Sequence, residues 1–230
     1  MRALVMVAVD AELAALVAAL GGGEPVTFGP VAGVEVATPA GPVEIVAGGV
    51  GPAAAAAATS AVLAHHGFDV VLSMGIAGGF AGHAIGSVIV APRTVAADLG
   101  CQLADRFLPL SEMGFGADSY DADPRWLALV TARAQSTGLV VQVGDIGTVS
   151  TVTGTAAGAA THAGRHACAG EAMEGFAVAE AASLYGVPFL EVRTVSNAVG
   201  PRDTSQWRIG DALRAAGAVV AAIFDEPAPW

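Results

Sequence analysis

A thioether and a carboxylate stand side by side in the segment AMEG, where Met173 is followed by Glu174. Apolar residues at helical spacing come next, so Glu174 is expected at the start of a helix over 174–185. An acid in that place can simply stabilise the helix dipole. The pair also suits a sugar, because a carboxylate accepts hydrogen bonds from two hydroxyls while the thioether lies against the ring. The residues alone allow both interpretations.

Two predicted strands end in polar or glycine-rich sequence. The apolar run 187–195 leads directly into Ser196 and Asn197, and the run from Asp69 leads into MGIAGG at 74–79. Open α/β sheets bind ligands at the carboxyl ends of their strands. The glycine segment is therefore either a tight turn or a backbone that a flat ligand can approach closely. The predicted strand 187–195 places the amide of Asn197 at its carboxyl end.

Two further segments have a structural and a functional interpretation. GGVGPA at 48–53 imitates the dinucleotide-binding fingerprint, but the acid of the next strand, Asp69, begins that strand instead of ending it, which argues against NAD. No cofactor is expected. GPRDTSQWR at 200–208 is either a solvated loop with Ser205 as a helix cap, or a lid in which Trp207 or an arginine reaches a ligand.

The elements that must position these residues alternate between strand-like and helical runs, which predicts an α/β fold with a mostly parallel sheet. TPAGP is a hairpin signal between 31–38 and 42–48, so the central sheet should be mixed. No composition shift divides the chain, and one domain over 1–230 is expected. The other predicted strands are 3–9, 69–79, 86–91, 139–146 and 187–195. The predicted helices are one that Asp10 caps and those at 52–67, 123–137, 156–167, 174–185 and 205–224.

Two segments lack such a pattern. Residues 93–119 show no clear period, and they are expected to form a loop over the site. The last residues, DEPAPW, are expected to be a loose tail.

Composition excludes several classes of protein. Gly (30) and Pro (12) interrupt every apolar run before it reaches membrane-spanning length, and the N-terminus lacks a secretory cleavage pattern, so a cytoplasmic protein without a membrane partner is expected. The net charge is −11 and the ten basic residues, all Arg, are scattered, which argues against nucleic acid as a partner.

Cys101 and Cys168 are too far apart in sequence to form a pair of metal ligands. His162 and His166 have i, i+4 spacing, but no carboxylate is expected on their face, so no metal is expected.

Five segments, in order and spacing, resemble the purine nucleosidase and phosphorylase family: VDAEL, GGVGPAAAA, MGIAGG, AMEGFAVAEAA and VPFLEVRTVSN. Within that family the pattern is most similar to the futalosine hydrolases, relatives of methylthioadenosine/S-adenosylhomocysteine nucleosidase that act in a menaquinone pathway. The resemblance covers nearly the whole chain. It implies a single α/β domain in which helices flank a mixed central sheet. It also implies pairing with a second subunit at the active site, so a homodimer or higher homo-oligomer is expected.

The resemblance also implies a reaction and residue roles. The reaction would be hydrolysis of the N-glycosidic bond of futalosine, which releases hypoxanthine and dehypoxanthine futalosine without metal or cofactor. Glu12 would orient the attacking water, Met173 and Glu174 would hold the ribose, and Asn197 would contact N7 of the purine. Further contacts to the small-molecule purine nucleoside are expected from Ile76, Ala77, Gly78 and Trp207.

Three positions depart from the adenine-specific relatives. Asn197 stands where they have Asp, and its NH2 group offers two donors for the N7 and O6 acceptors of hypoxanthine, although an Asn amide can also bind adenine. Ile76 stands where they often have Ser. Ala172 stands where they have a further Glu, now displaced to Glu171, so the sugar would be held by Glu174 alone.

Other activities remain as alternatives. One is a nucleosidase for methylthioadenosine, S-adenosylhomocysteine or aminodeoxyfutalosine, and another is a nucleoside-binding module without catalysis. A phosphorylase needs Arg side chains around phosphate, for which Arg93 and Arg193 are the candidates. Arg193 is expected to pair with Glu191 inside its strand, which favours hydrolysis.

Overall fold

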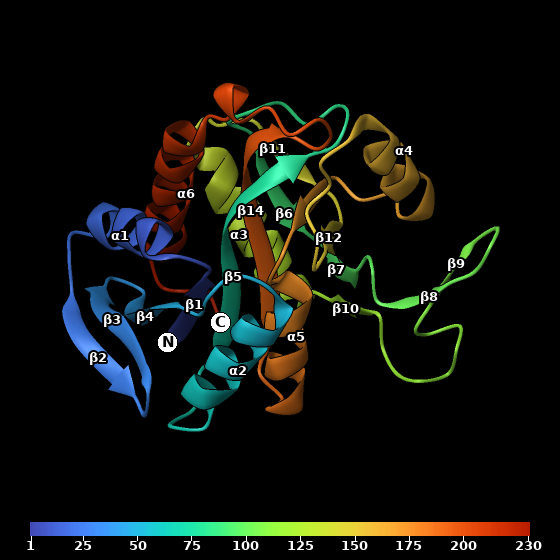
Figure 1. Ribbon diagram of the computed structural model, residues 1–230. Coiled ribbons are helices and arrows are strands. Elements are labelled where there is room, and N and C mark those ends of the chain that lie inside the picture. The colour runs from blue at the N-terminus through green and yellow to red at the C-terminus, as the bar shows by residue number, and fades with distance from the viewer.

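A long mixed β-sheet forms the middle of the molecule (Figure 1). The computed structural model describes all residues, 1–230. The main sheet has 12 strands, and their bounds are β1 (Ala3–Val7), β2 (Glu24–Phe28), β3 (Val31–Thr38), β4 (Gly41–Ala47), β5 (Val70–Gly79), β6 (Val88–Ala91), β7 (Arg93–Ala96), β10 (Ser119–Asp121), β11 (Val141–Val143), β12 (Ile146–Thr148), β13 (Gly170–Ala172) and β14 (Phe189–Ala198).

Strand β5 is the centre of this sheet because it pairs with three neighbours. β1 runs parallel to its first half, β13 runs antiparallel to its last two residues, and β14 runs parallel along its other edge. β14 in turn pairs antiparallel with β6, and β3 and β4 form the predicted hairpin. The predicted α/β fold with a mixed central sheet is therefore confirmed.

Helices cover both faces of the sheet (Figure 1). One face packs against α1 (Asp10–Ala19), α3 (Pro124–Ser136) and α6 (Ile209–Phe224), and the other against α2 (Pro52–Leu63) and α5 (Gly175–Leu184). A further helix, α4 (Ala156–Arg165), buries none of its residues. None of these helices has both the length and the apolar character of a membrane span.

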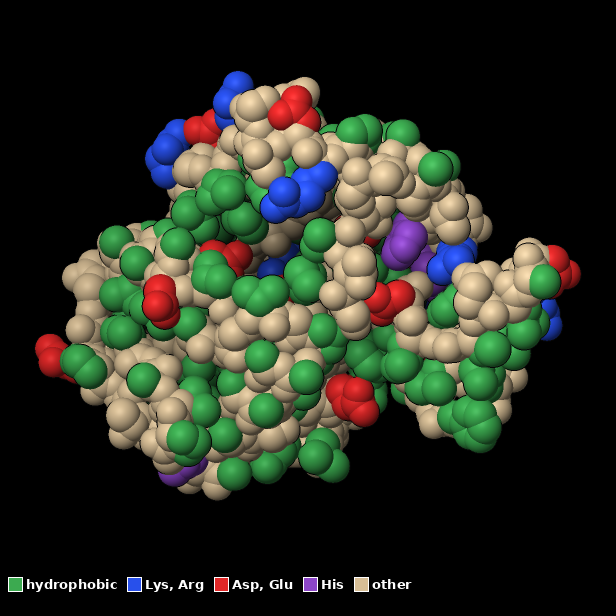
Figure 2. Space-filling model, viewed as in Figure 1, with side chains coloured by type: hydrophobic (Ala, Val, Ile, Leu, Met, Phe, Trp, Pro, Cys, Tyr) green, Lys and Arg blue, Asp and Glu red, His purple; other side chains and the backbone are tan.

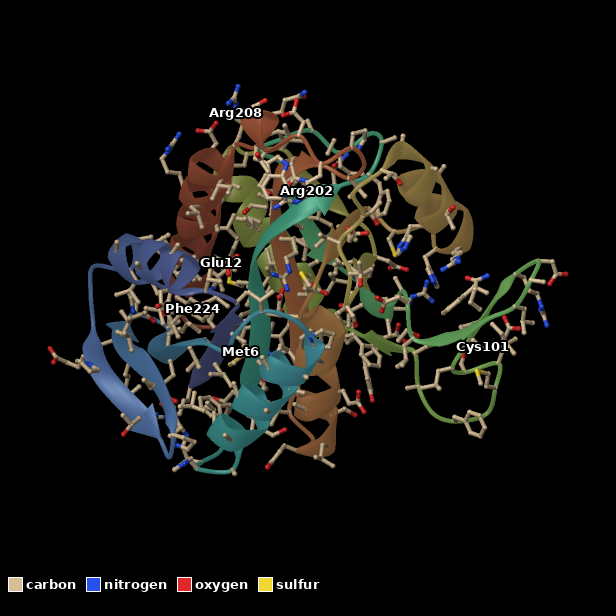
Figure 3. The ribbon with its side chains drawn as sticks, viewed as in Figure 1. Met6, Glu12, Cys101, Arg202, Arg208 and Phe224 are labelled. Atoms are coloured by element: carbon tan, nitrogen blue, oxygen red, sulfur yellow. The ribbon has the colours of Figure 1, made fainter.

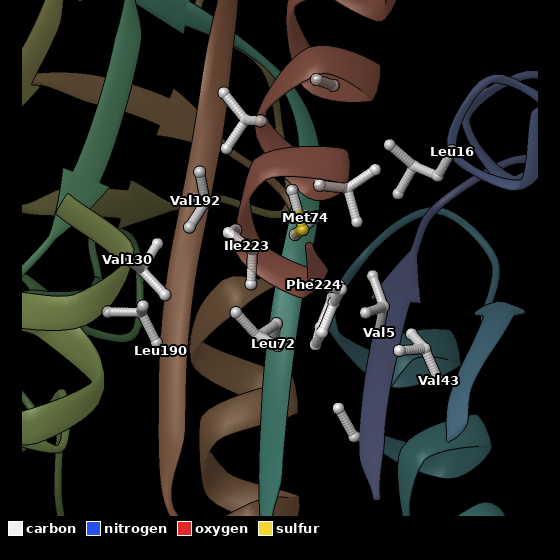
Figure 4. Close-up of a cluster of buried hydrophobic side chains, with 14 of the residues drawn as sticks. Val5, Leu16, Val43, Leu72, Met74, Val130, Leu190, Val192, Ile223 and Phe224 are labelled. Carbon is white, nitrogen blue, oxygen red and sulfur yellow. The ribbon is translucent and has the colours of Figure 1, made fainter. Parts of the chain in front are cut away.

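The two hydrophobic cores follow from the alternation of side chains along the inner strands. In β1, Val5 belongs to the core beneath α6, whereas Leu4 and Met6 belong to the core beneath α2 and α5. Figure 4 shows the first core, where Phe224 and Ile223 of α6 lie against strand side chains. Strands that are buried on both faces need the continuous apolar runs from which they were predicted.

The prediction of a loop over the site at 93–119 was wrong. β7 and β10 pair with each other in the main sheet, and β7 also pairs with β12. Between them β8 (Gly100–Gln102) and β9 (Phe107–Pro109) form a separate hairpin, which projects away from the body as an arm (Figure 1). Strands of three or four residues are too short to show a hydrophobic period in the sequence. Their formation also depends on pairing with strands distant in sequence, which no local pattern reveals.

The C-terminal tail is also held more firmly than predicted. The guanidinium of Arg133 on α3 donates to the carbonyl oxygens of Glu226 and Pro227, each at 2.9 Å. The Trp230 ring meets the Trp126 ring edge-on, with the centroids 5.5 Å apart. These contacts join segments about ninety residues apart, so no local sequence signal announces them.

Phe224 gives a direct test of the core beneath α6. Its side chain is fully buried, so Phe224→Ala should lower the free energy of unfolding by about 3–5 kcal/mol. Leu184→Ala is the matched control, because Leu184 is 78% exposed, and it should change stability little. Urea unfolding followed by circular dichroism measures both. Equal midpoints for the two variants would contradict this packing.

Candidate active site

Glu12 is a buried carboxylate held by three backbone amides. Its Oε2 accepts from the N–H groups of Ala8 and Val9 at 2.8 and 3.3 Å, and its Oε1 accepts from the N–H of Ile76 at 2.9 Å. The first two amides lie between β1 and α1, and the third lies on β5. The carboxylate therefore has a fixed position where two parallel strands meet their loops.

The start of α1 differs from the prediction in one respect. Asp10 was expected to cap the helix, but α1 begins at Asp10 and Val9 occupies the N-cap position. Glu12 satisfies the Val9 amide instead. A glutamate at the third position of a helix can bind the N-cap amide by reaching back to it. The sequence DAE therefore allows either Asp10 or Glu12 to cap the start of α1.

Glu174 lies at the N-terminus of α5, as predicted, and is also buried. Its Oε1 accepts from the N–H of Gly51 at 3.1 Å, and its Oε2 lies 3.3 Å from the N–H of Met173. Gly51 belongs to the turn that imitates a dinucleotide fingerprint. The amide of that turn thus binds a side chain of the protein itself.

Arg193 on β14 joins this carboxylate to a second one. Its Nε donates to Glu191 Oε1 at 2.8 Å, its Nη2 donates to Ser73 Oγ at 2.9 Å, and Nη2 lies 3.5 Å from Glu174 Oε2. The predicted pairing of Arg193 with Glu191 is confirmed. Burial alone would lower the pKa of the Arg193 guanidinium, but the charges of Glu191, Glu174 and Glu12 outweigh it and raise that pKa. The guanidinium is therefore a permanent cation at the floor of the site.

Gly75 explains how Glu12 and Arg193 approach the same part of β5. A Cβ atom there would collide with the carboxylate of Glu12 and lie 2.9 Å from Nη1 of Arg193. Only glycine leaves room for both charged groups beside the strand. The first glycine of MGIAGG is thus needed for packing within the protein.

Asn197 lies at the end of β14, beyond an irregularity that places it opposite Gly78 of β5. Its Oδ1 accepts from Ser196 Oγ at 2.7 Å, and its Nδ2 donates to the Ala198 carbonyl at 3.0 Å. These two bonds determine which end of the amide is the NH2 group. They leave one N–H for a ligand, whereas the sequence analysis counted two.

A cavity opens beside Asn197, and Figure 2 shows the face of the molecule that is hollowed there. Three predicted substrate contacts, Gly78, Asn197 and Trp207, line it. The other predicted site residues do not, and they lie nearer the middle of the sheet: Glu12, Ile76, Ala77, Met173 and Glu174.

The two groups of residues are connected along β5. Ile76, whose amide binds Glu12, precedes Gly78 by two residues, a separation of about 6.6 Å along a strand that keeps both on one face. Ala77 points to the opposite face, into a small core with Val195. Within three residues β5 thus contacts Glu12 and lines the cavity, while Ala77 points away from the cavity.

The segment after β14 covers one side of the cavity. Arg202 lies over the Trp207 ring, with its guanidinium carbon 5.6 Å from the centroid, and both residues line the cavity. The backbone N–H of Arg208 donates to the Ser196 carbonyl at 2.8 Å, which ties this segment to the strand end. In Figure 3, Arg202 and Arg208 lie above Glu12.

The predicted helix cap Ser205 does not cap α6, which begins at Ile209 with Arg208 at the N-cap position. Asp203 precedes the 3-10 turn Thr204–Gln206 and accepts from the Ser205 N–H at 3.1 Å and from the Gln206 side chain at 2.7 Å. Hydrogen bonds from Ser205 and Gln206 lower the pKa of the Asp203 carboxyl.

Two polar residues of the cavity, Glu171 and Thr153, were not predicted as site residues. Glu171 on β13 accepts from the N–H and the Oγ of Thr153, at 2.8 and 2.5 Å, and both residues line the cavity. Oε2 of Glu171 also lies 3.8 Å from Nδ1 of His162. No carboxylate had been expected on the face of the helix that carries His162. Thr153 follows β12, whose carboxyl end lies beside that of β13, and neither of these three-residue strands was predicted from the sequence. No group of three or more His, Cys, Asp or Glu side chains is arranged for a metal ion.

Comparisons with known proteins give the family. The phosphorylase superfamily matches residues 2–226. The futalosine hydrolase of Streptomyces coelicolor is 51% identical over 179 residues, which are 75% of this chain and 74% of that protein. The futalosine hydrolase of Acidothermus cellulolyticus is 40% identical over 214 residues, 93% and 86% of the two chains.

Solved structures show the same fold. The futalosine hydrolase of Helicobacter pylori superposes with a TM-score of 0.87 at 17% identity, over 98% of this chain and 97% of that chain. The 5′-methylthioadenosine/S-adenosylhomocysteine nucleosidase of Neisseria meningitidis, in complex with methylthio-immucillin-A, superposes with a TM-score of 0.86 at 20% identity, over 97% and 98%. By sequence and by fold, this chain belongs to the phosphorylase superfamily and, within it, to the family of the futalosine hydrolases.

Proposed function

We propose that this protein is an N-glycosyl hydrolase that cleaves futalosine into hypoxanthine and dehypoxanthine futalosine. The C1′–N9 bond breaks with its electron pair moving to the purine, and the oxygen of water forms the new bond to C1′. One proton leaves the water and one reaches the base, so the reaction needs no further reactant. The observation that carries this proposal is the buried carboxylate of Glu12, fixed by three amides, one of them from Ile76 on the strand that also lines the Asn197 cavity with Gly78.

Glu12 is proposed to orient the water and take its proton. Oε2 already accepts from two N–H groups, whereas Oε1 accepts from one and keeps a lone pair for a water molecule. A base that is held in place before substrate binds needs little reorganisation in the transition state.

Glu174 and Met173 are proposed to hold the ribose. Positive charge develops on the sugar ring as the bond breaks, and a carboxylate beside it stabilises that charge. Arg193 lies behind Glu174 and keeps the carboxylate in position, with Nη2 3.5 Å from Oε2. Arg193 therefore supports the proposed mechanism as a positioning residue.

Asn197 is proposed to stabilise the departing purine. Negative charge builds on the base, and the N–H of the amide that is not bound to Ala198 can donate to N7. Gly78, directly opposite, lets the flat ring approach the backbone. Ile76 extends this strand surface in the proposal, whereas Ala77 points to the opposite face, so its predicted contact to the substrate is limited to its backbone.

The 5′ arm of futalosine, which carries a benzoate, is proposed to lie under the segment 200–208. Trp207 offers a face for the aromatic ring and Arg202 offers a cation for the carboxylate.

We also propose that the enzyme acts as a homo-oligomer in the cytoplasm. Apolar side chains exposed on the arm around β8 and β9, Leu103 and Phe115, support the association of copies.

Hydrolysis is favoured over phosphorolysis by the partners of the arginines. The guanidinium of Arg193 is shared between Glu191 and Glu174, and that of Arg93 is paired with Asp145 at 3.0 Å from Nε. Neither candidate named from the sequence is thus free for phosphate.

A substrate comparison tests the proposed function. Purified protein should release hypoxanthine from futalosine in buffer alone, and added phosphate should leave the rate unchanged. Aminodeoxyfutalosine and methylthioadenosine are the comparison substrates, with free base measured by chromatography. Turnover that requires phosphate, or turnover of methylthioadenosine in place of futalosine, would show that the proposed activity is wrong.

Glu12→Gln tests the role of the base. The amide cannot accept a proton from water, so kcat on futalosine should fall by roughly 10²- to 10⁴-fold while futalosine still binds. Calorimetry measures binding, and thermal unfolding checks that the variant is folded. Glu180→Gln is the control, because Glu180 is exposed on α5. A kcat for Glu12→Gln equal to that of the control would rule out this role.

A further inference from the structure

Glu171 is a buried carboxylate of the cavity that the proposed mechanism does not use. It is 8% exposed, lines the same cavity as Asn197, and is not bonded to Glu174 or Arg193. Thr153 donates to each of its oxygens, which uses two of the roughly four positions at which a carboxylate accepts. The remaining capacity is available to a ligand.

Three residues form a row across the sheet beneath the cavity. Glu171 of β13 and Asn197 of β14 each pair with Gly78 of β5, one on either side. All three line the same cavity, and two strand spacings separate the outer Cα atoms by about 10 Å. The acid and the amide therefore stand on opposite sides of one glycine.

Gly78 leaves the space between Glu171 and Asn197 open for a ligand. A Cβ atom at Gly78 would lie 2.9 Å from Cγ2 of Val199 and 3.3 Å from Nδ2 of Asn197. A side chain at this position would fill the floor between the two polar groups. The row is thus suited to a flat ring whose opposite edges meet an amide and a carboxylate.

The amide by itself cannot choose between hypoxanthine and adenine. One N–H of Asn197 is donated to Ala198, and the other reaches N7, which is an acceptor in both bases. The atoms that differ are at positions 6 and 1. Hypoxanthine presents O6 and an N1–H donor, whereas adenine presents an amino group and an N1 acceptor.

We propose that Glu171 determines base specificity by accepting the N1–H of a 6-oxopurine. A carboxylate accepts only, so it binds N1–H of hypoxanthine and repels the lone pair of adenine N1. Thr153 holds the carboxylate in place before the base arrives. This inference rests on the proposed function for the position of the base, and it adds the residue that reads the edge opposite N7.

The test compares futalosine with aminodeoxyfutalosine, which carries the 6-amino base, in the native enzyme and in Glu171→Gln. The glutamine side chain can donate to adenine N1, so the ratio of kcat/KM values should shift toward the amino substrate by roughly 10- to 100-fold. Thr153→Val is the control, because it removes a bond to Glu171 and keeps the acid. It should change both rates by a similar factor. An unchanged ratio in Glu171→Gln, or an equal shift in Thr153→Val, would overturn the proposal.

Binding of free bases keeps this test separate from the proposed reaction. By calorimetry, native protein should bind hypoxanthine more tightly than 1-methylhypoxanthine, which lacks the N1–H, and Glu171→Gln should reduce that difference. If native protein shows this preference but does not cleave futalosine, the proposed function fails and the inference stands. If it cleaves futalosine but binds the two bases equally, the inference fails alone.

Discussion

The structure of this site depends on one buried guanidinium, that of Arg193. A carboxylate taken out of water is costly unless a charge or hydrogen-bond donor compensates it, and Glu191, Glu174 and Glu12 all gather around this one cation. Burial raises the pKa of the Glu191 carboxyl, against the attraction of Arg193. The arginine thus allows several acids to sit at the floor of one site, and glycines at 75 and 175 leave the room that their side chains need.

β14 connects this charge cluster to the cavity. Arg193 and Asn197 are four residues apart on one strand, so the group that positions the ribose acid and the group proposed to bind the purine are parts of the same element. β5 runs parallel beside it and carries the Ile76 amide toward Glu12 and Gly78 toward Asn197. Two paired strands therefore set the spacing between the sugar end and the base end of the proposed site.

Much of the fold could be predicted because its inner strands and helices have strong local patterns. The apolar runs of β1, β5 and β14 and the helix that begins at Pro52 lie within a few residues of their predicted bounds. The short strands β7 and β10 could not be predicted, since three or four residues carry no period. In the site, the helix-start acids and the strand-tip amide were visible in sequence. The pairing of Glu171 with Thr153 was not, because it joins a loop to the three-residue strand β13, eighteen residues away in sequence.

A neutral amide donor at position 197 is proposed to support departure of a 6-oxopurine. Replacing Asn197 by Asp tests it most directly, with futalosine turnover measured from acidic to neutral pH. An ionised Asp cannot donate, so turnover at neutral pH should fall by roughly 10²- to 10³-fold relative to the native enzyme. The deficit should narrow as the pH falls and the new carboxyl gains a proton. Turnover equal to that of the native enzyme at every pH would contradict the claim.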